Sequence, residues 1–136
     1  MELKLAAKLD NLNKVLAFIE ETIEPVECPM KVKLQIDVAV EEIFVNIANS
    51  AYGDGEGYAI IKVELFDDPK RVSITFVDEG CPYDPLKKED PDVTLSASER
   101  QIGGLGIFMV KKSMDDMIYE YKNNQNHLTI VKHFEN

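Results

Sequence analysis

The sequence lacks any apolar run that approaches the ~20 residues a membrane-spanning helix needs. Its first residues, Met1 to Leu5, also lack the long apolar stretch and the small-residue cleavage site of a secretory signal peptide. These two absences argue against a membrane protein and against secretion. The cytoplasm is therefore the expected location.

Cysteine is scarce as well. Cys28 and Cys81 stand alone in the sequence, without a CxxC pair or a histidine-rich neighbourhood. A disulfide or a zinc site has little support from such a pattern. We expect both cysteines to be ordinary packing residues.

Basic residues are few relative to acidic ones. The chain has 15 Lys and Arg against 25 Asp and Glu, which gives a net charge of −10. A strongly acidic surface repels phosphate backbones, so nucleic acid is not an expected partner. Any bound polyphosphate would have to be held by local features such as backbone amides, a helix N-terminus or a metal ion.

The length of 136 residues predicts one domain over residues 1–136, and the sequence has no internal repeat. Alternating and helical periodicities give the following order of elements: a strand at 2–6, helices at 12–23 and 29–51, strands at 59–65 and 72–76, a helix at 103–114, and strands at 118–122 and 128–134 around a turn at 123–126. Strands that pair as hairpins, with helices segregated to one face, predict an α+β two-layer sandwich.

Residues 81–102 have no periodicity and contain three prolines and many charges. A segment of this length without secondary structure is uncommon in a compact domain, and such segments are usually functional lids or disordered. We expect a lid here.

Three short motifs carry candidate chemistry. The first, EIFVN, places Glu42 and Asn46 one turn apart on the same side of the second helix. A carboxylate there can accept a proton from an attacking hydroxyl, and a carboxamide oxygen suits Mg²⁺. Taken alone, the pair fits an ordinary solvated polar flank of the helix better than a binding site.

The second motif, DEGCP, ends a strand. Asp78 continues the face of Val72, Ile74 and Phe76, so its carboxylate should point inward, where it needs a partner such as an exocyclic amine of adenine. Gly80 allows a sharp turn and a close approach to a flat ring. A plain strand-ending turn is the alternative.

The third motif, GGLGIF, follows the predicted lid and opens a helix. Its glycines expose backbone amides, and the partial positive charge of a helix N-terminus attracts phosphate oxygens. The segment has neither the P-loop pattern nor the βαβ context of a Rossmann fingerprint. A hinge between loop and helix is the alternative.

Taken together, in this order, the three motifs resemble the nucleotide-binding boxes of the GHKL (Bergerat-fold) ATPase superfamily, over about residues 35–134. Finer detail resembles the anti-sigma-factor serine/threonine kinases, including the Tyr83-Asp84-Pro85 run and the stretch from Gly103 to Tyr121. The resemblance implies a histidine-kinase-like fold with a mixed, mainly antiparallel sheet and helices on one face.

The resemblance also implies roles for individual residues. Glu42 would be the general base, Asn46 the Mg²⁺ ligand and Asp78 the partner of the adenine amine. The remaining residues implied to hold ATP are Gly80 beside the base, Gly103, Gly104, Leu105 and Gly106 at the phosphates, and Thr129 of the last strand at adenine.

The sequence departs from the family pattern at Ser50, where many members have a histidine one turn after the asparagine. Arg100 lies near the position of a basic lid residue in some members, and it could equally be a solvated loop charge. The histidines, His127 and His133, lie in the final hairpin, so a complete histidine kinase is disfavoured.

The function expected from the resemblance is Mg-ATP-dependent phosphorylation of a serine on a STAS-type anti-sigma-factor antagonist. Sequestration of a sigma factor and a homodimeric state are implied as well, while nucleic acid and membrane partners are not. The alternative from a different class is a non-catalytic, ATP-dependent regulatory binding module of the same fold. The presence of Glu42 favours catalysis, because a pure binder does not need the base.

Overall fold

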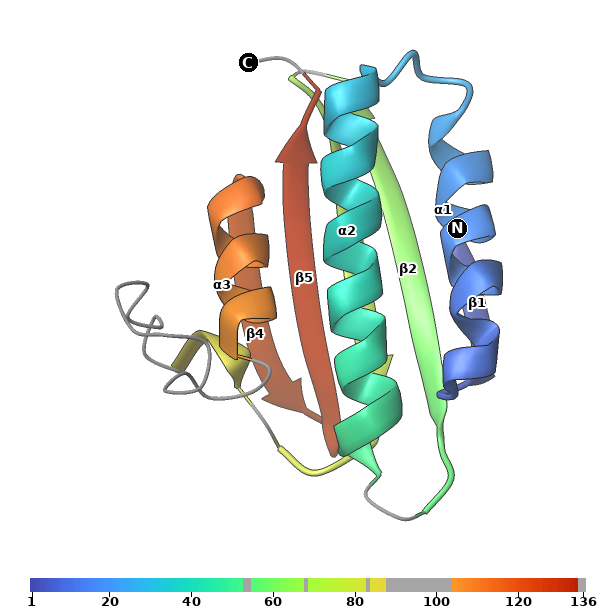
Figure 1. The fold of residues 1–136 in the computed structure, drawn as a ribbon, viewed down its shortest axis with the longest axis vertical. Helices are drawn as coiled ribbons and strands as arrows, with labels where there is room; N and C mark the ends of the chain where they lie inside the picture. The colour runs from blue at the N-terminus through green and yellow to red at the C-terminus, as the bar shows by residue number, and fades with distance from the viewer. Residues whose placement is uncertain (53–54, 68, 83, 88–103, 135–136) are drawn as a thin grey trace.

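The computed structural model describes residues 1–52, 55–67, 69–82, 84–87 and 104–134. Its regular elements are ordered as the sequence predicts (Figure 1): β1 (Glu2–Ala6), α1 (Leu12–Ile23), α2 (Met30–Asn46), β2 (Tyr58–Asp67), β3 (Lys70–Asp78), α3 (Gly104–Ser113), β4 (Asp116–Lys122) and β5 (Gln125–His133). None of the helices in the described part of the chain combines the length and apolar character that crossing a membrane requires.

The strands form a five-stranded sheet in the order β1-β2-β3-β5-β4. Each neighbouring pair is antiparallel, so the sheet is wholly antiparallel rather than mixed. All three helices lie on one face of this sheet (Figure 1). The predicted α+β two-layer architecture is therefore confirmed.

The core lies between the sheet and the helices, with α2 at its centre. One row of side chains crosses the sheet where Ile61 pairs with Phe76 and Phe76 pairs with Leu128, and all three are buried. The apolar stripe predicted for the second helix packs against this face, with Ile36, Ala39, Val40, Ile43 and Phe44 all buried. Burying each large side chain contributes roughly 1.5–3 kcal/mol to folding.

The end of α2 is tied to the open end of the β2–β3 hairpin, where β2 begins and β3 ends. The helix continues as a π-helical turn over Ile47–Ala51, and Tyr52 follows it. The Tyr52 hydroxyl donates to the carbonyl of Tyr58 at 2.6 Å and accepts from the amide of Glu79 at 2.8 Å. These two bonds hold the last turn of the helix against the end of β3.

The β4–β5 hairpin differs from the predicted one. Its turn consists of Asn123 and Asn124, both with positive φ (55° and 61°), the pattern of a tight two-residue hairpin. The sequence prediction extended the turn to residue 126, whereas β5 already begins at Gln125. As a result Asn126 lies within the strand, opposite Asp78 of β3.

His127 lies on the sheet face away from the helices, and its Nε2 is buried without a hydrogen-bond partner among the described residues. Burial, together with Lys122 and Lys62, lowers the pKa of His127, against weaker opposing effects of Glu120 and Asp78. The unfolded chain therefore binds this proton more readily than the folded one. Above the unfolded pKa of about 6.5 the imidazole is neutral in both states, and its contribution to stability is fully present. As the pH falls through that value towards the lower folded pKa, this contribution is lost.

We therefore predict that His127→Gln loses less free energy of unfolding than wild type between pH 7 and pH 5. Urea denaturation at a series of pH values measures this difference. His133→Gln removes a histidine from the same strand and is the matched control. If the free energy of unfolding became equally less dependent on pH in both variants, the effect could not be assigned to the burial of His127.

Candidate functional site

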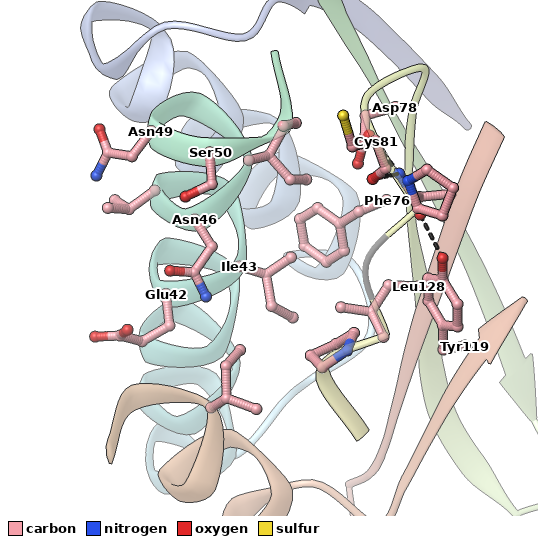
Figure 2. Close-up of a pocket in the computed structure, with 17 residues that line it drawn as sticks. Glu42, Ile43, Asn46, Asn49, Ser50, Phe76, Asp78, Cys81, Tyr119 and Leu128 are labelled. Atoms are coloured by element: carbon pink, nitrogen blue, oxygen red, sulfur yellow. Dashed lines mark hydrogen bonds between the residues drawn. The ribbon is translucent and has the colours of Figure 1, made fainter. Parts of the chain in front are cut away.

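A cavity of about 630 Å³ lies where the C-terminal part of α2, the end of β3 and the start of β5 meet (Figure 2). Its walls combine an apolar floor with polar groups from the helix and from the strand ends. The lining residues are Glu42, Ile43, Val45, Asn46, Ile47, Asn49, Ser50, Ala51, Phe76, Asp78, Cys81, Pro82, Pro85, Ile107, Tyr119, Asn126 and Leu128.

The helical wall carries the first predicted motif. Glu42 and Asn46 both line the cavity and are both half-buried, so a ligand can reach them. Figure 2 shows Glu42, Asn46 and Ser50 following one another along one side of the helix. Ser50 and Asn49 belong to the π-helical turn, a wider turn that often occurs at functional sites. The pair therefore lies on a pocket wall, and not on the solvated flank that its spacing alone favoured.

The opposite wall is centred on Asp78, the last residue of β3. Its side chain points into the interior, as expected, and is only 7% exposed. The Oδ1 atom accepts hydrogen bonds from the amide of Gly80 and from Nδ2 of Asn126, both at 2.9 Å. Among the described residues, no hydrogen bond reaches the other oxygen, Oδ2.

Gly80 has a different role from the one expected. It does not line the cavity; instead its backbone lies against the end of the long helix. A Cβ at this position would be 2.1 Å from the carbonyl oxygen of Ala51. The amide of Cys81 donates to that same oxygen at 3.1 Å. Gly80 thus permits the loop after β3 to dock on the end of the helix, which fixes the distance between the two walls.

The third motif reaches the site through Gly106. A Cβ on Gly106 would be 2.1 Å from Oε2 of Glu42, so the missing side chain leaves room for this carboxylate. Gly104 and Leu105 form the first turn of α3, where unpaired backbone amides occur. Gly103, predicted to open this helix, lies outside the described residues, as do Tyr83, Arg100 and most of the predicted lid.

The position of Thr129 contradicts its predicted place at the base. Buried and half-buried residues alternate along β5, and Thr129 is on the face away from the helices. Its hydroxyl shares a hydrogen bond of 2.9 Å with that of Thr75 on the neighbouring strand. The pocket face of β5 instead carries Asn126 and Leu128. Because side chains alternate between faces, an odd separation from Asn126 puts Thr129 on the wrong side.

Sequence reasoning missed Asn126, which is buried beside Asp78, and Tyr119, whose hydroxyl donates to Oδ1 of Asn126. It also missed the floor formed by Phe76 and Leu128. A signal for Asn126 was present. If Asn123-Asn124 is taken as a two-residue hairpin turn, the alternation places Asn126 on the same face as Leu128 and Ile130.

The described lining residues of the cavity include two carboxylates, Glu42 and Asp78, and no basic side chain. Within the described part of the chain, no cluster of three His, Cys, Asp or Glu side chains could hold a metal ion by itself. The carboxamide oxygen of Asn46 therefore fits a hard cation that brings further ligands with it, as Mg²⁺ does with phosphate and water.

Comparison with known sequences agrees with this geometry. The sequence model of the histidine kinase-like ATPase domain matches residues 5–132. Serine/threonine-protein kinase BtrW of Bordetella bronchiseptica is 27% identical over 103 residues, which cover 76% of this chain and 72% of that protein. Serine-protein kinase RsbW of Listeria monocytogenes is 29% identical over 91 residues, which cover 63% of this chain and 57% of that protein. The predicted resemblance to serine/threonine kinases is thereby confirmed.

Two solved structures share the fold. The RsbU and RsbW domains of a Mycobacterium tuberculosis protein match 98% of this chain with a TM-score of 0.64 at 14% identity, and the match spans 32% of that chain. The histidine kinase domain of a blue-light activated kinase from Erythrobacter litoralis matches 92% of this chain with a TM-score of 0.58, also at 14% identity, over 60% of that chain. At this identity the likeness establishes the fold alone.

Proposed function

The chain belongs to the histidine kinase-like ATPase domain family, and on that premise we propose that it binds Mg-ATP in the cavity and transfers the γ-phosphoryl group to a serine of a protein partner. The kinase names of the sequence relatives support this enzyme class. The observation that carries the proposal is the arrangement of the cavity. Glu42 and Asn46 lie together on its helical wall, while the buried carboxylate of Asp78 lies on the opposite wall.

The cavity has suitable walls for a nucleotide. Its volume of about 630 Å³ falls in the range of roughly 300–1,000 Å³ that is usual for small-molecule sites. Asp78 offers a carboxylate to the exocyclic amine of adenine, and the side chains of Phe76 and Leu128 offer an apolar surface to the flat ring. Gly104, Leu105 and Gly106 would present amides of the first turn of α3 to phosphate oxygens.

Asn46 would hold Mg²⁺ through its carboxamide oxygen, and the phosphates and water would complete the shell. When bound, the ion neutralises charge on the phosphoryl group. Since none of the described lining residues is basic, the ion would supply positive charge that these residues do not.

Glu42 would act on the substrate serine. Its carboxylate accepts the hydroxyl proton while the serine oxygen bonds to the γ-phosphorus and the bond to the leaving ADP oxygen breaks. The close contact with Gly106 restricts where this carboxylate can lie. Positioning and electrostatics would then supply most of the acceleration.

The proposed partner is a STAS-type anti-sigma-factor antagonist, with a sigma factor as a second ligand and a homodimer as the working state in the cytoplasm. This part of the proposal rests on the sequence resemblance to the anti-sigma-factor kinases and on the similarity to the serine-protein kinase RsbW.

The first test is calorimetric titration with ATP, with and without Mg²⁺. For wild type we predict Mg-dependent binding. Asn46→Ala should weaken binding in the presence of Mg²⁺ by on the order of tenfold, because it removes the one carboxamide ligand of the ion. Without Mg²⁺ the two proteins should bind alike.

Gln35→Ala is the matched control, since it truncates a carboxamide on the same helix outside the cavity. It should keep the wild-type response to Mg²⁺. If wild type bound no adenine nucleotide under either condition, the proposed function would be wrong.

A further inference from the structure

The most completely engaged polar side chain in the cavity wall is Asn126, which is 6% exposed. It pairs with Asp78 across β3 and β5. Its Nδ2 donates to Oδ1 of Asp78 at 2.9 Å and to the carbonyl of Cys81 at 3.0 Å, with a longer contact of 3.4 Å to the carbonyl of Gly80. Its Oδ1 accepts from the hydroxyl of Tyr119.

These contacts determine which way the amide faces. Only the amide nitrogen can donate to a carboxylate and to carbonyls, and only the amide oxygen can accept from the phenol. Asn126 therefore links three parts of the wall: the carboxylate of Asp78, the backbone of the loop after β3, and Tyr119 of β4. A rotation of Asp78 about its side-chain bonds would break this set of hydrogen bonds.

The same contacts also orient Asp78. Asn126 and the amide of Gly80 both donate to Oδ1, which leaves Oδ2 as the oxygen with no hydrogen bond from the described residues. An oriented carboxylate discriminates between purines. It accepts a hydrogen bond from a 6-amino group and repels the lone pairs of a 6-oxo group.

We propose that Asn126 is a positioning residue for nucleobase selection, which holds Asp78 so that the site accepts 6-aminopurine and rejects 6-oxopurine nucleotides. This inference rests on the proposed ATP site. It assigns no contact between Asn126 and the base, because the contacts of the amide are already made with protein groups.

The test compares ATP with ITP, whose base has a 6-oxo group in place of the 6-amino group and carries a proton on N1. Dissociation constants for both, with Mg²⁺ present, are measured on the full chain. We expect wild type to prefer ATP by on the order of ten- to a hundredfold, the effect of one hydrogen bond to a charged group. In Asn126→Ala the preference should shrink to about threefold or less, chiefly through weaker ATP binding.

This ratio separates positioning from a merely structural role. A general loss of structure would weaken both nucleotides equally and leave the ratio unchanged. Tyr119→Phe removes the donor to the amide oxygen and keeps the ring, so it should reduce the preference in the same direction by a smaller factor. It also provides a second variant if Asn126→Ala does not fold.

An isosteric substitution of Asn126 gives an independent test of its contact with Asp78. Asn126→Asp sets a second carboxyl group against Oδ1 of Asp78 and against the carbonyls of Gly80 and Cys81. Two carboxylates at this distance share a proton at low pH and repel each other once both are ionised. ATP binding by this variant should therefore weaken as the pH rises from 5 to 8 by a larger factor than in wild type.

Gln125→Glu is the matched control, because it makes the same amide-to-acid change one residue away on the other face of β5. It should keep the wild-type ATP/ITP ratio. An unchanged ratio in folded Asn126→Ala and Tyr119→Phe would overturn the inference while leaving the ATP site intact. If wild type bound neither nucleotide, the proposed function itself would fail and this inference with it.

Discussion

Replacing Glu42 with glutamine should lower the rate of phosphoryl transfer by on the order of 10²- to 10⁴-fold, the usual contribution of a general base. The variant keeps the size and hydrogen-bonding reach of the side chain and loses the ability to take the serine proton. Mg-ATP binding should change little, because Asn46 and Asp78 remain in place on the two walls of the cavity.

Two rates measure this effect: transfer of labelled γ-phosphate to the STAS-domain proteins encoded in the same genome, and slow ATP hydrolysis without a partner. The matched control is Glu41→Gln, which neutralises the adjacent, exposed carboxylate outside the cavity. It should retain the wild-type rate of transfer.

Equal rates in wild type and Glu42→Gln would contradict the assignment of Glu42 as the base. If wild type bound Mg-ATP tightly and transferred phosphate to none of these partners, the non-catalytic regulatory module would become the better description. The two results are distinguishable because nucleotide binding and transfer are measured separately.

Gly80→Ala should destabilise the fold by about 1–3 kcal/mol or more, the usual range for overpacking a tightly packed site. The new Cβ would lie 2.1 Å from the Ala51 carbonyl oxygen and 2.6 Å from its carbon. Backbone atoms cannot rotate aside as a side chain does. The loop after β3 must therefore shift, which strains the bond between the Cys81 amide and Ala51.

Urea denaturation gives this difference in the free energy of unfolding. Gly106→Ala is the informative comparison, because its Cβ would contact the carboxylate end of Glu42, a flexible side chain. Within a helix, alanine also gains up to about 1 kcal/mol over glycine. This variant should keep near-wild-type stability and lose transfer activity by displacing the base. Equal stability of Gly80→Ala and wild type would contradict the docking role of Gly80.

Much of the fold was predictable because hydrophobic periodicity is local. The stripe from Ile36 to Ile47 indicated a buried helix, and the alternations at 59–65 and 72–76 indicated a hairpin. Both are present: the strands are longer than predicted, whereas α2 ends at Asn46, before the π-helical turn. The same local geometry predicted that Glu42 and Asn46 share one side of the helix and that Asp78 points inward. Each of these inferences needs only the repeat of a single element.

Contacts between elements could not be read in this way. Gly80 is required by the carbonyl of Ala51, a residue distant in the sequence, and Gly106 by the carboxylate of Glu42. The sheet face on which Asn126 and Thr129 lie depends on where a two-residue turn ends, since a shift of one residue moves each side chain of a strand to the opposite face. The sequence by itself therefore determined the elements, their order and the polar groups available, because these follow from spacing along the chain. Only the tertiary structure decided which of those groups meet around the cavity, because strand register and close backbone packing are set by partners elsewhere in the fold.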